Sequence, residues 1–143
     1  SVYTALREGN GQPNMFMFED WQCRMGATLW EDLDGYIANS PLLFADKIHT
    51  PVLIFHCDQD EAVSFYDGRN LFLALRRLQR PVWMLNYMGQ GHFLTSRPAE
   101  VDWTIRLQQF FDHYLKDIPM PRWMKEGINI NERGMDQKYD LVR

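Results

Sequence analysis

Apolar residues gather in two short continuous runs near the middle of the chain, at residues 50–57 and 81–87. The first run is rich in β-branched residues and has a proline near its start. Continuous apolar runs of this length are typical of strands that are buried on both faces of a parallel sheet. We therefore expect a pair of parallel strands at these positions.

Between and after the two runs, apolar residues recur at intervals of three and four, which is the spacing of one helix face. Residues 65–78 form the first such stretch and residues 98–116 the second, where Pro98 suits a first helical turn. The order strand, helix, strand, helix predicts an α/β fold with a parallel sheet and right-handed crossovers. Because two strands do not make a stable sheet alone, we expect the remaining strands to come from residues before Ser1 or from another chain.

The rest of the chain carries weaker patterns. Residues 8–14 are rich in turn formers and predict a loop. An apolar, aromatic stretch at 15–21 predicts a short helix or the wall of a pocket, and residues 26–37 predict a second short helix. After 119–121 the chain is polar and shows no period, so we expect residues 119–143 to form an irregular tail.

The composition suits one packed domain and argues against a nucleic-acid-binding protein and against a membrane-spanning one. Of the 143 residues, 45% are hydrophobic, and the formal net charge is −4. Nucleic-acid binding needs a clustered basic face, whereas the only tight basic cluster here is Arg76 with Arg77. No apolar run approaches the roughly 18 residues that span a bilayer, so no membrane span is expected. No signal peptide is visible at the start, and the compartment is not indicated.

Neither the cysteines nor the acids form a recognisable metal site. Cys23 and Cys57 are the only cysteines and form no Cys-x-x-Cys motif, which indicates neither a disulfide framework nor a zinc site. The acids of residues 58–62 faintly resemble the start of a calcium loop, but the segment lacks the glycine and the closing glutamate of such a loop. We therefore expect neither a metal ion nor another cofactor.

Two polar turns carry the candidate chemistry, and each follows one of the expected strands. Asp60 comes after the first strand, and His92 comes after the second, behind the flexible Gly-Gln-Gly of residues 89–91. Parallel sheets build their sites at the carboxyl edge, and one crossover places such turns side by side. An acid followed by a histidine in this order is the second half of a Ser-Asp-His triad.

Other interpretations of these residues remain open at this point. Asp58 competes with Asp60 for the role of acid, and either carboxylate could simply form a turn or cap a helix. His92 alone could be a surface residue, although the order, the strand context and the spacing together favour the triad. We expect His56, at the end of the first strand, to pack or to support the site rather than to react.

The first half of a triad is absent from the sequence. No Gly-x-Ser-x-Gly elbow occurs in the 143 residues, and none of the serines has that context. These serines are Ser1, Ser40, Ser64 and Ser96. The residues therefore predict an acid and a base without their nucleophile.

Several segments together resemble the C-terminal half of the prolyl oligopeptidase family of serine peptidases, known as S9. The resemblance covers about residues 20–127. It is carried by TPVLIFHCDQDEAV (50–63), LRRL (75–78), PVWMLNY (81–87), GQGH (89–92) and QQFFDHYL (108–115), with further similarity at RMGATLWE (24–31) and NSPLLFADKI (39–48). Each motif is moderately specific, and their order and spacing are strongly so.

The resemblance implies a fold and assigns roles to residues. Residues 1–118 would be the C-terminal part of an α/β-hydrolase catalytic domain with an incomplete sheet. The family's acid stands three residues before a valine, which selects Asp60 and makes Val63 a wall of the pocket for the residue before the scissile bond. His92 would be the base. Ala62 stands where relatives of the dipeptidyl-peptidase type carry an asparagine, so that specificity is not implied.

The resemblance also implies partners for this chain. Its substrate would be an oligopeptide, cleaved through an acyl-enzyme. The serine elbow, the oxyanion hole and an upstream β-propeller would belong to a missing N-terminal part of the same protein, and these residues alone would be inactive. Two alternatives stay open. One is a non-catalytic module that docks or self-associates through its exposed sheet edge, and the other is part of an α/β-hydrolase esterase.

Overall fold

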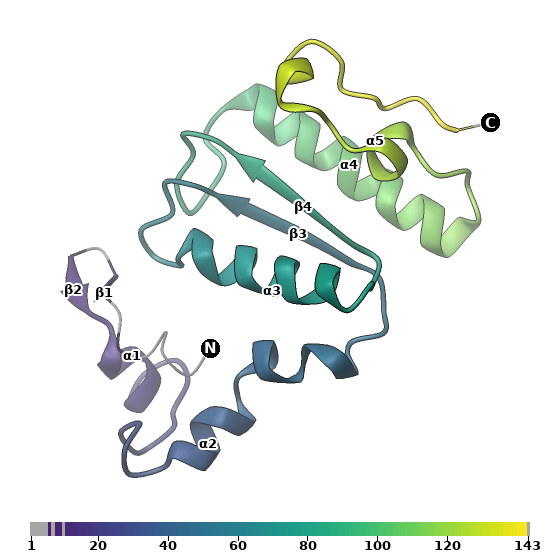
Figure 1. The fold of residues 1–143 in the computed structure, drawn as a ribbon. Coiled ribbons are helices and arrows are strands. Elements are labelled where there is room, and N and C mark those ends of the chain that lie inside the picture. The colour runs from purple at the N-terminus through teal and green to yellow at the C-terminus, as the bar shows by residue number, and fades with distance from the viewer. Residues whose placement is uncertain (1–5, 7, 10, 143) are drawn as a thin grey trace. The chain divides into compact units, whose positions relative to one another are not determined.

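The computed structural model describes Leu6, residues 8–9 and residues 11–142 of the chain. The described residues fall into two compact units, which divide between Phe93 and Leu94. Figure 1 shows the elements of both, and each unit is described by itself.

A parallel pair of strands is the centre of the first unit. Strand β3 (Val52–Cys57) pairs with β4 (Val82–Tyr87) in parallel, with Val52 opposite Val82 and Cys57 opposite Tyr87. Helix α3 (Phe65–Arg77) connects them. The two strands and the helix between them therefore confirm the α/β arrangement that the apolar pattern predicts.

Polar residues stabilise both ends of helix α3. The Ser64 side chain accepts a hydrogen bond from the Tyr66 amide at 3.2 Å, which satisfies one of the orphan donors of the first turn. Asp67 lies in the first turn, and Arg76 and Arg77 lie exposed in the last turn. The negative charge near the start of the helix and the positive charges near its end interact favourably with the helix dipole.

The apolar face of α3 forms the core of this unit. Leu75 is fully buried and clusters with Ala45 and Val82. Partly buried apolar residues surround that cluster, namely Ile48, Val52, Ile54, Leu71, Phe72 and Ala74. The helix therefore packs on the strand pair, and this core includes Val52 and Val82, the first residues of the two strands.

The segments before β3 differ in detail from the sequence-based expectations. Strand β1 (Glu8–Gly9) pairs antiparallel with β2 (Gln12–Pro13) within the stretch expected to be a loop, where Asn10 lies outside the described residues. Helix α1 (Met15–Glu19) is short, as expected. The following helix, α2 (Leu33–Ala38), begins later than the pattern suggests.

The late start of α2 has a local cause. The Asp32 carboxylate accepts a hydrogen bond from the Gly35 amide at 3.0 Å and so caps the helix at that point. Upstream, Gly26 has a φ of 70° and turns the chain. The chain then continues through the 3₁₀ helix η2 (Pro41–Lys47) into β3.

The second unit is built on the long helix α4 (Arg97–Lys116), which confirms the helix predicted there. A short helix, α5 (Arg122–Glu126), and the 3₁₀ helix η3 (Ile130–Glu132) follow. The expectation that residues 119–143 are irregular was therefore wrong for these two elements. They are too short for a period to show in the sequence.

Buried contacts attach α5 and the last residues to α4. Trp123 is buried, and its indole Nε1 donates to the Gln109 side chain at 2.8 Å. The same Gln109 donates through Nε2 to the carbonyl of Tyr139 at 2.7 Å. One glutamine on α4 thus holds two later segments of the chain.

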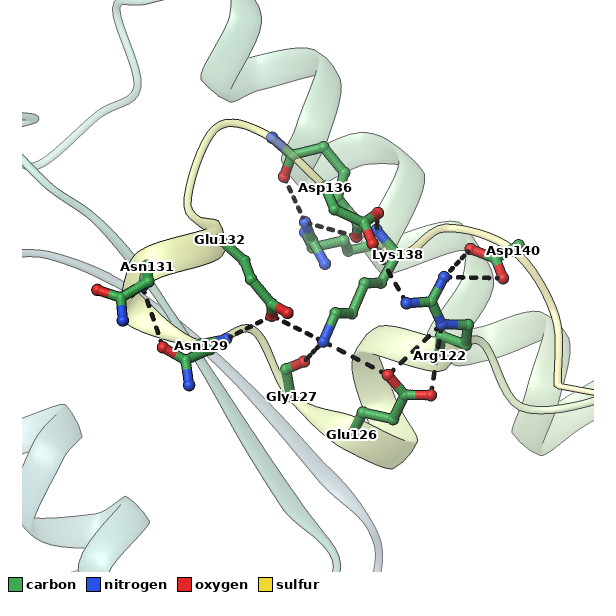
Figure 2. Close-up of polar contacts among 11 residues, drawn as sticks. Arg122, Glu126, Gly127, Asn129, Asn131, Glu132, Asp136, Lys138 and Asp140 are labelled. Carbon is green, nitrogen blue, oxygen red and sulfur yellow. Dashed lines mark hydrogen bonds and ion pairs between the residues drawn. The ribbon is translucent and has the colours of Figure 1, made fainter.

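A second anchor of this unit is the buried side chain of Lys138 (Figure 2). Its ammonium donates to the Gly127 carbonyl at 3.1 Å and pairs with Glu132 at 2.9 Å and Glu126 at 3.4 Å. The hydrogen bond to Glu132 raises the pKa of Lys138. Glu126 also pairs with Arg122, so the network joins α5 to the end of the chain.

The end of α4 offers a test of backbone strain. Asp117 has a φ of 55°, and the next amide, that of Ile118, bonds back to the Asp112 carbonyl at 3.2 Å. This left-handed position suits glycine, and an acid there also opposes the helix dipole. We expect Asp117→Gly to raise the free energy of unfolding by about 0.5 kcal/mol, measured by urea denaturation.

The control is Asp117→Ala, which removes the same charge but keeps a side chain in the left-handed conformation. We expect no net gain from that variant, because alanine tolerates the left-handed conformation less well than aspartate and this offsets the loss of the unfavourable charge. An equal gain from both variants would show that charge, and not backbone strain, limits this helix end.

Candidate active site

The acid turn, residues 58–63, follows β3 and is organised around one carboxylate. Asp60 Oδ1 accepts hydrogen bonds from the Val63 amide at 2.8 Å and the Ala62 amide at 3.0 Å. An aspartate that binds amides two and three residues ahead closes a turn on its own side chain. The Asp60 side chain is only 7% exposed.

The histidine turn, residues 88–92, follows β4 and brings His92 to Asp60. Gly89 has a φ of 73°, which glycine adopts without steric cost. The His92 Nδ1 atom lies 3.0 Å from Oδ2 and 3.2 Å from Oδ1 of Asp60. The imidazole is 44% exposed, so a half-buried base rests on a buried carboxylate.

This contact selects one form of the neutral imidazole. A carboxylate only accepts hydrogen bonds, so Nδ1 must carry the proton that it shares with Asp60. The Nε2 atom of the neutral ring then has a lone pair with which to take a proton. The Phe93 ring packs edge-to-face against the imidazole, with ring centroids 4.8 Å apart.

The surroundings of Asp60 favour its ionised form. Burial alone raises its pKa, but hydrogen bonds from the Val63 amide, from His92 and from the Ala62 amide outweigh burial and leave the pKa below its usual value. A lowered pKa means that the ionised carboxylate stabilises the fold. That contribution is complete above the ordinary pKa of an aspartate and is lost as the pH falls through the lowered one.

Asp58, the rival of Asp60, has a different contact. Its Oδ1 accepts a hydrogen bond from the Gly89 amide at 2.6 Å. The neighbouring Gln59 amide donates to the Gln90 carbonyl at 3.1 Å. Two residues of the acid turn therefore bind the backbone of the histidine turn, while Asp60 binds the imidazole.

His56 lies behind the acid turn, buried as the sequence leads us to expect. Its Nε2 donates to the Val63 carbonyl at 3.0 Å and lies 3.7 Å from Asp60 Oδ2. Gly68 on α3 makes room for the ring, because a Cβ atom there would stand 2.6 Å from His56 Nδ1. A glycine inside a helical pattern often marks such a close approach, so Gly68 was a signal available in the sequence.

Val63 is held through its backbone and not through its side chain. Its amide binds Asp60 and its carbonyl binds His56, while the residue is 43% exposed. The side chain is thus available at the surface beside the Asp60–His92 pair. Its role as a pocket wall stays a prediction.

Ser40 and Ser64 make hydrogen bonds that support the local fold. Ser40 is buried and its hydroxyl donates to the Tyr36 carbonyl at 2.7 Å, while Ser64 caps α3. Ser1 lies outside the described residues. Over the part of the chain that the structure describes, no cluster of three or more His, Cys, Asp or Glu residues is placed to hold a metal, and no helix is long and apolar enough to cross a membrane.

The sequence also matches the model of a known protein family. The sequence model of the prolyl oligopeptidase family matches residues 7–117. The chain belongs to the prolyl oligopeptidase family. The strands β3 and β4 with helix α3 are accordingly part of an α/β-hydrolase fold, which confirms the fold class expected from the sequence.

Three curated proteins that are similar to the chain agree with this assignment. The chain is 32% identical over 103 residues to dipeptidyl-peptidase 5 of Porphyromonas endodontalis, which covers 69% of this chain and 15% of the relative. It is 26% identical over 103 residues to an uncharacterized peptidase of Bacillus subtilis, with 70% and 15% covered. It is 30% identical over 80 residues to the acylamino-acid-releasing enzyme of Rattus norvegicus, with 56% and 10% covered.

These similarities place the chain among relatives of serine-type peptidases of the prolyl oligopeptidase family. The chain spans about a sixth or less of the length of the curated relatives that it matches.

Proposed function

We propose that this chain supplies the acid and the base of a serine peptidase, as the C-terminal part of its α/β-hydrolase catalytic domain. The observation that carries the proposal is the contact of His92 Nδ1 with the buried Asp60 carboxylate at 3.0 Å. The family relationship supports it, because serine-type hydrolysis needs this pair.

In the proposed mechanism, His92 Nε2 takes the proton of a serine hydroxyl as that oxygen attacks the scissile carbonyl. The same proton then passes to the leaving amine, and an acyl-enzyme remains for water to hydrolyse. Asp60 holds the imidazole with its proton on Nδ1 and stabilises the imidazolium once it forms. The serine and the oxyanion donors come from a part of the protein outside this chain.

The proposed substrate is an oligopeptide, and Val63 is proposed to line the pocket for the residue before the scissile bond. Two features support this role for Val63. Its side chain is exposed, and its backbone is bound to the acid itself. Ala62 offers no polar side chain at the neighbouring position, so we do not propose that residue as an anchor for a substrate terminus.

A fluorophosphonate probe, which labels an activated serine covalently, tests the division of labour. We expect the complete protein that contains this chain to be labelled and to hydrolyse a chromogenic peptide. We expect the 143 residues alone to show neither, because an acid and a base without a nucleophile do not form a triad.

Two results would contradict the proposal. Labelling of the isolated chain would place the nucleophile within these residues. A complete protein that hydrolyses peptides but is labelled equally well after His92 is replaced by alanine would show that another base activates the serine.

A further inference from the structure

Three consecutive residues of the acid turn each bind a different residue of the histidine turn. The side chain of Asp58 binds the Gly89 amide at 2.6 Å. The backbone of Gln59 binds the Gln90 carbonyl at 3.1 Å. The side chain of Asp60 then binds His92 at 3.0 Å, so the two turns are joined by three successive contacts.

We propose that Asp58 is a positioning residue that fastens the histidine turn to the acid turn and so keeps His92 on Asp60. This inference rests on the proposed function, since it concerns the same pair of groups. It assigns to Asp58 a task other than that of the acid, for which it competes in the sequence.

The histidine turn needs an additional restraint because its two glycines allow the backbone many conformations. Gly89 and Gly91 flank Gln90, and glycine loses more conformational freedom on ordering than any other residue. The imidazole is 44% exposed, so water competes with Asp60 for its Nδ1 proton, and a single hydrogen bond of this kind adds little net stability to the turn. The Asp60–His92 contact alone is therefore a weak restraint on the position of its own base.

The contact from Asp58 is suited to that task. A carboxylate that accepts from a backbone amide makes a charge-assisted hydrogen bond, which is shorter and stronger than a neutral one. At 2.6 Å the bond to Gly89 is shorter than either contact between Asp60 and His92. It also acts on the backbone at the end of β4, where the turn begins, and so limits where the rest of the turn can go.

A neutral acceptor oxygen can make the same contact, although more weakly, whereas a triad acid needs its charge, and this distinguishes positioning from catalysis. An asparagine at position 58 keeps an acceptor oxygen of the same reach. A triad acid, by contrast, must be negative to stabilise the imidazolium, and its amide variant loses most activity. Asparagine and alanine at position 58 therefore separate the two roles.

The experiment compares Asp58→Ala, Asp58→Asn and the matched control Glu61→Ala in the complete protein. Glu61 is an exposed acid of the same turn, so its replacement also removes one negative charge from that turn. We expect Asp58→Ala to lower kcat for a peptide substrate by about 30-fold with little change in KM, because small displacements of a catalytic group are costly. We expect kcat of Asp58→Asn and of Glu61→Ala to stay within about threefold of the parent. Each of these variants keeps an oxygen at position 58 that can accept the hydrogen bond from the Gly89 amide.

A second measurement does not depend on activity. Hydrogen–deuterium exchange of a peptide that covers residues 88–92 reports whether the histidine turn is held. We expect faster exchange in Asp58→Ala, and exchange close to that of the parent in Asp58→Asn and Glu61→Ala.

The outcomes distinguish this inference from the proposed function. Equal losses of kcat in Asp58→Ala and Asp58→Asn would overturn positioning in favour of a charge requirement, and unchanged exchange in Asp58→Ala would overturn it as well. If the exchange pattern follows the expectation while His92→Ala leaves peptidase activity intact, Asp58 still fastens the turn, and only the proposed function fails.

Discussion

Replacing His92 by alanine is expected to lower kcat/KM for peptide hydrolysis by about a million-fold in the complete protein. Losses of about this size follow when the base of a Ser-Asp-His triad is removed, because the serine hydroxyl then has no group to take its proton. The structure motivates the choice of residue, since the Nδ1 atom of His92 lies 3.0 Å from the Asp60 carboxylate. Steady-state hydrolysis of a chromogenic peptide measures the effect.

Two further variants make the result specific. Asp60→Asn keeps the size of the side chain but cannot stabilise an imidazolium, and we expect it to lower kcat by about 10⁴-fold. His49→Ala removes an exposed histidine outside both turns and is expected to change little. Near-normal hydrolysis by the His92 variant would remove this residue from the mechanism, and a full loss in His49→Ala would point to a general effect of histidine removal.

The second large effect is expected in the core between helix α3 and the strand pair. Leu75 is 0% exposed and packs with Ala45 and Val82 between helix α3 and the strand pair. Truncation of a fully buried leucine removes its transfer free energy and leaves a cavity as well. We expect Leu75→Ala to lower the free energy of unfolding of this chain by about 3 kcal/mol, measured by urea denaturation.

The matched control lies on the same helix. Leu73 is 53% exposed, two residues before Leu75, and its replacement by alanine makes the same chemical change without opening a cavity. We expect Leu73→Ala to change the free energy of unfolding by less than about 0.5 kcal/mol. Equal effects of the two variants would show that the face of α3 that carries Leu75 does not form the core.

The central part of the fold is predictable because its signals are local and continuous. Strands β3 and β4 lie within the two mainly apolar runs, and helices α3 and α4 coincide with two stretches of helical period. The order of these elements is enough to predict a parallel pair with a crossover helix. The structure confirms that order and adds the register, which no pattern along one strand can specify.

The start of α2 and the elements of the tail were harder to predict for physical reasons. At Asp32 a single capping hydrogen bond outweighs the apolar pattern that precedes it. Helix α5 makes only about one turn, so periodicity cannot reveal it. Buried Trp123 attaches it to α4, and Arg122 pairs with Asp140, a residue far away in the sequence.

The candidate site was predictable in its side chains and not in its backbone. Asp60 and His92 have the chain order and the strand context of a triad, and the structure brings them together. Asp58 and Gln59 bind backbone groups of the histidine turn. Because every residue carries such groups, the sequence contains no residue type that would predict these contacts. For that reason Asp58 looked like a second candidate for the acid.

The way in which Val63 is bound has a consequence for how such a site can diversify. Its amide and its carbonyl are both committed, to Asp60 and to His56, whereas its side chain is not. Mutations at this codon therefore change what the surface beside the base presents without disturbing the bonds that hold the acid. If Val63 lines a substrate pocket as proposed, variation at this one position can alter substrate preference while the contact between Asp60 and His92 stays in place.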